Sequence, residues 1–93
     1  MAILKVELQQ QIETTLRALE AQLQASGEGA VYRIVRRYER ARLALQQDGE
    51  TWRQSAAVTG ILNCARGYLE SSSRWDQPFL HEMGRTEEMV KKL

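Results

Sequence analysis

The chain has 93 residues, a length that suits one domain with a modest hydrophobic core. Apolar residues make up 43% of it, and 13 basic side chains nearly balance 12 acidic ones, which excludes a disordered, highly charged chain and an overall attraction to nucleic acid or anionic lipid. A single proline and abundant Leu, Ala, Gln, Glu and Arg favour helix. We therefore predict an all-α fold, a small three- or four-helix antiparallel bundle in which residues 1–93 form a single helical domain.

The first predicted helix covers residues 3–25, where one apolar stripe recurs every three or four residues. Gly27 follows this stripe and can supply the left-handed residue that ends a helix. Ile3 and Val6 lie outside the stripe. Because extra apolar side chains near a helix end are typical of a self-association contact, we predict a homodimer interface there, with fraying of an unpacked terminus as the alternative explanation.

The second predicted helix covers residues 30–47 and ends at Gly49. A third is predicted over residues 52–70, because Thr51 and Gln54 have the spacing of a capping box. Its apolar residues cover a wide arc, so we expect this helix to be the central one. Beside the arc lie small residues that let a neighbouring backbone approach closely, namely Ala56, Gly60 and Gly67.

The fourth predicted helix covers residues 77–92. Asp76 has the right character to cap its first N–H groups, and Pro78 falls in the first turn, where proline is tolerated. Trp75 and Leu80 then occupy the two positions of a hydrophobic staple, which fixes how the chain enters the helix.

A line of arginines is the strongest local charge signal in the sequence. The steps between them place the four guanidinium groups on one side of the second predicted helix, opposite its apolar face; they are Arg33, Arg36, Arg37 and Arg40. Such a surface suits the carboxylates of an acidic protein or the phosphates of a nucleic acid. The alternative is a solvated helix face, partly paired with Glu39, Glu13 or Glu20.

Aromatic residues form a second candidate surface. Trp52 and Trp75 both lie at predicted helix starts, and the segment after Trp75 is rich in residue types that dominate binding hot spots, including Phe79, Leu80 and Met83. We list Trp52, Trp75, Phe79, Leu80 and Met83 with the arginines as candidate partner-binding residues. The alternative is core packing, with Trp75 as a staple and Trp52 covering the end of the bundle.

Candidates for chemistry are few. His81 is the single histidine, and Arg85 stands where the second histidine of a zinc-binding H-E-x-x-H motif would be. Cys64, the single cysteine, falls in the apolar arc of residues 52–70, where we expect a buried thiol with a raised pKa. We therefore predict no catalytic residue, no metal, no cofactor and no enzymatic activity; arginines arranged around an anionic metabolite are the catalytic alternative.

The predicted function is regulatory binding. We expect a small inhibitor, anti-activator or adaptor that binds another protein, and the alternative is a helical nucleic-acid-binding protein that uses the same arginines. A single cysteine fits a reducing compartment, and no apolar run is long enough for a membrane span or a signal peptide. We therefore predict a cytoplasmic homodimer with no membrane contact, whose partner the sequence does not identify.

Overall fold

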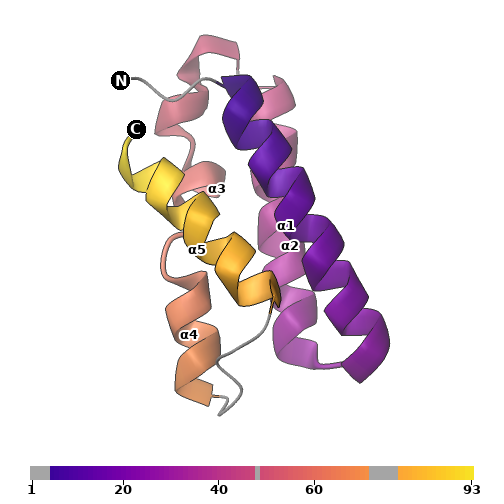
Figure 1. Cartoon of the computed structure of the whole chain (residues 1–93). Coiled ribbons are helices and arrows are strands. Elements are labelled where there is room, and N and C mark those ends of the chain that lie inside the picture. The colour runs from indigo at the N-terminus through magenta and orange to yellow at the C-terminus, as the bar shows by residue number, and fades with distance from the viewer. Residues whose placement is uncertain (1–4, 48, 72–77) are drawn as a thin grey trace.

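A computed structural model of the chain describes residues 5–47, 49–71 and 78–93, and every element within these ranges is helical. The elements in chain order are α1 (Lys5–Ser26), α2 (Gly29–Gln47), the 3-10 helix η1 (Gly49–Gln54), α3 (Ala56–Thr59), α4 (Cys64–Ser71) and α5 (Pro78–Lys91). Helices α1 and α2 form an antiparallel hairpin, and α5 packs against α1 (Figure 1). The predicted all-α fold is confirmed.

The α1–α2 hairpin follows from the apolar stripe and its glycine stop. Leu8, Ile12 and Leu19 in α1 are completely buried, and Leu16 is nearly so. Gly27 has φ of 68°, and its N–H donates to the Leu23 carbonyl oxygen at 2.7 Å, so this residue ends α1 as predicted. The turn brings α2 back along α1, which lets the two apolar faces meet.

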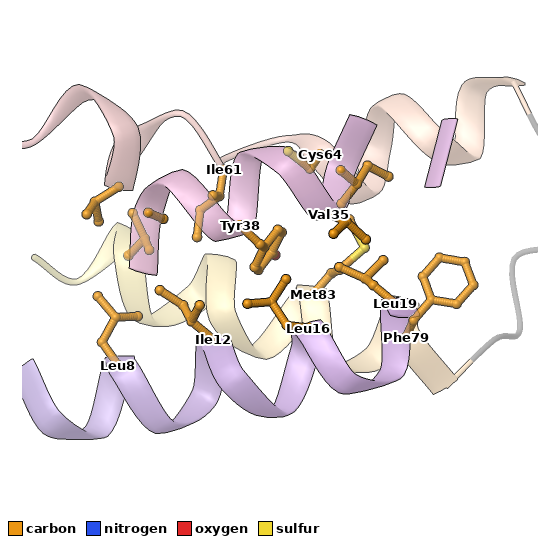
Figure 2. Packing of buried hydrophobic residues seen from close by; sticks show 14 of the residues in the cluster. Leu8, Ile12, Leu16, Leu19, Val35, Tyr38, Ile61, Cys64, Phe79 and Met83 are labelled. Atoms are coloured by element: carbon orange, nitrogen blue, oxygen red, sulfur yellow. The ribbon is translucent and has the colours of Figure 1, made fainter. Parts of the chain in front are cut away.

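One hydrophobic core joins the described elements (Figure 2). The inner face of α2 is buried at all six of its apolar positions, which are Val31, Ile34, Val35, Tyr38, Ala41 and Leu45. Helix α5 begins with Pro78 as its first residue and adds Phe79, Met83 and Val90 to the same core. None of the described helices has the length and apolar character that crossing a membrane requires.

The continuous helix predicted over residues 52–70 is wrong. The chain instead forms η1, the short α3 and then α4, and α2 is the helix that contacts all three of them. Ser55, with Oγ accepting from the Ala57 N–H at 3.2 Å, caps α3 in place of the predicted Thr51. Asn63, with φ of 68°, sits in the left-handed region directly before α4, so the helical path is interrupted there.

A buried carboxylate compensates for this interruption. Glu87 of α5 is 8% exposed, and its Oε1 accepts from the Asn63 N–H at 2.8 Å while Oε2 accepts from the Ala65 N–H at 3.0 Å. The first N–H groups of a helix lack intrahelical partners and favour negative charge. Glu87 thus serves as a cap for α4 supplied from α5, and it holds the start of α4 against α5.

Candidate functional site

Four arginines of α2 form the most distinctive surface of the described chain, and we call it the Arg face: Arg33, Arg36, Arg37 and Arg40. All four side chains are exposed, as predicted from their spacing. They lie opposite the buried inner face of α2, because a helix that packs one side into the core turns the other side to solvent.

The Arg face is not neutralised by carboxylates of the described residues. No ion pair joins any of its guanidinium groups to Glu13, Glu20 or Glu39, and the first two of these glutamates instead lie with Arg17 and Arg42 at another hollow. The contacts of the Arg face are weak: Arg36 Nη1 donates to the Tyr32 hydroxyl oxygen at 3.3 Å, and Arg37 Nη1 to Cys64 Sγ at 3.8 Å. The partial pairing with these glutamates, which belonged to the alternative explanation of a solvated helix face, is therefore absent, and the guanidinium groups of the Arg face are exposed to solvent.

Two adjacent hollows that share Arg37 lie beside the Arg face, between α2 and the α3–α4 segment, and we call them together the groove. Its first part has a volume of about 230 Å³ and is lined by Arg33, Ile34 and Arg37 on one side and by Cys64, Gly67 and Tyr68 on the other. Ile34, Cys64 and Tyr68 are 7%, 6% and 3% exposed, so the floor of this part offers a small apolar area beneath a basic rim.

The second part of the groove begins at Arg37, which lines both parts. It has a volume of about 320 Å³, and here Arg37 and Arg40 face Ala56, Ala57 and Gly60. We predicted that these small residues let a neighbouring backbone of the same chain approach closely. Ala56 and Gly67 are instead exposed, and a Cβ added at Gly67 would meet no atom within 4 Å, so no described backbone packs against Gly67. The opposite wall, including Tyr68, could not be found from the local sequence pattern, because it depends on where the chain turns back along α2.

The second candidate surface is corrected by the structure. Phe79 and Met83 are at most 1% exposed, and Trp52 and Leu80 are 6% and 8% exposed. These side chains belong to the core, so they do not present an exposed partner-binding surface; the same apolar character that suits hot spots also favours burial. Trp75 lies outside the described residues.

The predicted dimer contact is only partly visible. Ile3 lies outside the described residues, and Val6 at the start of α1 is 56% exposed. Exposure leaves the Val6 side chain available to a second copy, but it is equally compatible with a solvated helix end. The homodimer interface stays a prediction.

Comparison with known proteins assigns the sequence to a family. Residues 2–93 match a family model described as "YeeD uncharacterised protein". The chain belongs to the YeeD family. It is similar to "Uncharacterized protein YeeD" of Bacillus subtilis (strain 168), with 33% identity over 89 residues that cover 92% of this chain and 88% of the relative. No solved structure matches the chain. The Arg face and both walls of the groove lie within the part shared with the YeeD family.

Two buried groups of this YeeD family member hold their protons strongly. Burial raises the pKa of the Cys64 thiol, and the nearby Arg37 guanidinium offsets part of that effect. Burial also raises the pKa of Tyr38, and the negative charge of Glu87 adds to it. Both groups therefore stay neutral near pH 7, and Cys64 contributes an apolar surface to the groove instead of a reactive thiolate.

We expect Cys64 to be alkylated by iodoacetamide at least about tenfold more slowly in the folded protein than in urea, since only the thiolate reacts and the side chain is 6% exposed. The folded state keeps this proton to a higher pH than the unfolded chain. The thiol's contribution to the free energy of unfolding is therefore complete below its ordinary pKa of 9.0 and is lost as pH rises above it.

Mass spectrometry of a time course measures the alkylation rates of Cys64 in the folded protein and in urea. Equal rates would contradict the burial of this thiol.

Proposed function

We propose that this YeeD family protein is a small non-enzymatic regulator, of the inhibitor, anti-activator or adaptor type, that binds another protein through the Arg face. The observation that carries the proposal is the group of exposed arginines without carboxylate partners among the described residues, beside a groove with an apolar floor. Arginine is favoured at protein interfaces because its planar fork matches carboxylates and its stem packs on apolar surface.

The groove favours a protein over a nucleic acid as the partner. Phosphates could reach the exposed guanidinium groups, but they would make no use of the small apolar area that Ile34, Cys64 and Tyr68, each at most 7% exposed, leave accessible at the groove floor. The chain also has a net charge of only +1, so it lacks the broad positive field that non-specific nucleic-acid binding uses. Nucleic-acid binding by the Arg face remains the alternative function.

Charge reversal on the Arg face is expected to abolish capture of the partner. Arg36→Glu/Arg37→Glu places two negative charges on an exposed helix surface, so the protein should keep its helical circular dichroism while it loses at least about 90% of the captured protein, because like charges oppose docking. Affinity capture from a lysate of the source organism, treated with nuclease and quantified by mass spectrometry, measures the effect.

The matched control is Lys91→Glu/Lys92→Glu, which changes the net charge by the same amount at exposed positions at the end of α5. This control should capture the partner normally. Equal capture by the wild type and the Arg36→Glu/Arg37→Glu variant would remove the Arg face from the proposal. Anisotropy titrations with duplex and single-stranded oligonucleotides at low salt test the alternative, and tight binding that weakens steeply with salt would favour nucleic acid.

A homodimer in the cytoplasm also remains part of the proposal. Support for the dimer is the exposed Val6 near the start of α1, and support for a reducing compartment is the single cysteine, which is buried as a free thiol.

A further inference from the structure

The Arg face presents its charges in a line that follows the groove. Arg33 and Arg37 border the first part of the groove, and Arg37 and Arg40 border the second. With a rise of 1.5 Å per residue, these arginines succeed one another at about 6 Å and then about 4.5 Å along the α2 axis. An occupant that neutralises all three needs carboxylates at matching intervals along one edge.

The opposite wall limits the shape of that occupant. Ala56, Ala57 and Gly67 project little or nothing into the groove, and Ile34 lies at its floor. Small side chains let a helix approach to about 8 Å between axes. A helix lying here would place apolar side chains over the small wall, where Ala56 and Gly67 are exposed, and over the small part of Ile34 that is still accessible.

Backbone hydrogen bonding favours a helix over an extended segment. One wall of the groove is helix α2, and the other consists of α3, α4 and the turn between them. The described residues contain no strand, so they offer no strand edge to an extended peptide. A helix satisfies its own backbone groups, and glutamates at positions i, i+4 and i+7 repeat along it at the same intervals as Arg33, Arg37 and Arg40.

We propose that the groove between α2 and the α3–α4 segment takes an amphipathic helix of a partner protein, with carboxylates along one edge that pair with Arg33, Arg37 and Arg40 and an apolar face that covers the groove floor. This inference rests on the proposed function, since it names the chemistry and the conformation of the segment that the Arg face binds. The specificity comes from the spacing of the carboxylates together with the apolar contact.

The test uses a synthetic peptide of about 18 residues, long enough to be helical, with glutamates at i, i+4 and i+7 and leucines on the adjacent face. A peptide of the same composition in scrambled order is its control. Fluorescence anisotropy with the full chain should show at least about tenfold tighter binding of the patterned peptide, because the scrambled one cannot align its charges and its apolar face together.

Gly67→Leu adds an apolar side chain to the groove and keeps all four arginines of the Arg face, and its Cβ meets no atom within 4 Å. We expect it to weaken binding of the patterned peptide at least about tenfold. Gly84→Leu is the matched control, because Gly84 is also helical and also has open space at its Cβ, but it lies on α5 and does not line the groove. This variant should bind like the wild type, and circular dichroism confirms that both variants fold.

Three outcomes would overturn the groove proposal alone. The first is that the two peptides bind equally, or that neither binds. The second is that Gly67→Leu binds the patterned peptide as the wild type does, and the third is that light scattering shows a wild-type dimer which Gly67→Leu converts to a monomer. The last would make a second copy of this chain the occupant. In the first two cases the proposed function would stand as long as Arg36→Glu/Arg37→Glu still abolishes protein capture. Undiminished capture by that double variant would instead remove the proposed function itself.

Discussion

Replacing Glu87 with alanine is expected to lower the free energy of unfolding by about 3 kcal/mol, because it removes both acceptors of a buried capping interaction. The N–H groups of Asn63 and Ala65 would lose part-buried bonds of 2.8 and 3.0 Å to a carboxylate that is itself 8% exposed. Glu87→Gln keeps one acceptor and turns a donor toward the other N–H, so we expect a loss of about 2 kcal/mol. Urea denaturation measures both changes as shifts of the midpoint.

The neighbouring Glu88 provides the control for this prediction. Its carboxylate is exposed and its described contact is with the Lys91 Nζ at 3.4 Å, an i, i+3 pair on the surface of α5. Glu88→Ala should therefore change the unfolding free energy by less than about 0.5 kcal/mol. Equal losses for Glu87→Ala and Glu88→Ala would show that Glu87 does not cap α4 in solution.

Local sequence patterns predicted the helices whose apolar stripes face one core. This holds for α1, α2 and α5, where the spacing of apolar residues and the stop at Gly27 are enough. The break before α4 was missed because its cause is not local. Residues 56–70 have a helical apolar pattern, while the carboxylate that stabilises a fresh helix start at Cys64 comes from Glu87, far along the chain. A glutamate within the apolar stripe of α5 and an asparagine, which tolerates left-handed backbone, were the available signals.

The candidate site likewise combines a feature that local spacing predicts with one that depends on residues distant in the sequence. The exposure of the Arg face follows from spacing alone, since its arginines lie opposite the apolar positions of one helix. The groove does not, because its second wall depends on how residues 56–68 pack beside α2, including the break at Asn63 that precedes Cys64 and Tyr68. Residue type wrongly predicted a partner-binding surface at Phe79, Leu80 and Met83, because large apolar side chains are favoured both at interfaces and in a core.

Phe79→Ala tests that correction, and we expect it to lower the free energy of unfolding by about 4 kcal/mol. The Phe79 ring is 1% exposed and packs edge-on against Tyr68, with 5.2 Å between ring centroids. Urea denaturation measures the loss, and Leu69→Ala is the control, because Leu69 is 40% exposed and should cost less than about 1 kcal/mol. A loss as small as that of the control would mean that Phe79 is not a core residue in solution.

Phe79→Leu separates a core role from a binding role. It retains most of the apolar volume, so the protein should fold with a loss of about 1 to 2 kcal/mol. If Phe79 acts only in the core, this variant captures the same partner as the wild type, because the Arg face is untouched. If Phe79 contacts the partner directly, capture falls although the chain stays folded.

Tyr68 links the start of α5 to the groove, since it packs on Phe79, lines the groove and donates from its hydroxyl to Glu28 Oε2 at 3.0 Å. Retained capture by Phe79→Leu, together with loss in Arg36→Glu/Arg37→Glu, would therefore locate binding on α2 and its groove and leave the start of α5 as the support behind that wall.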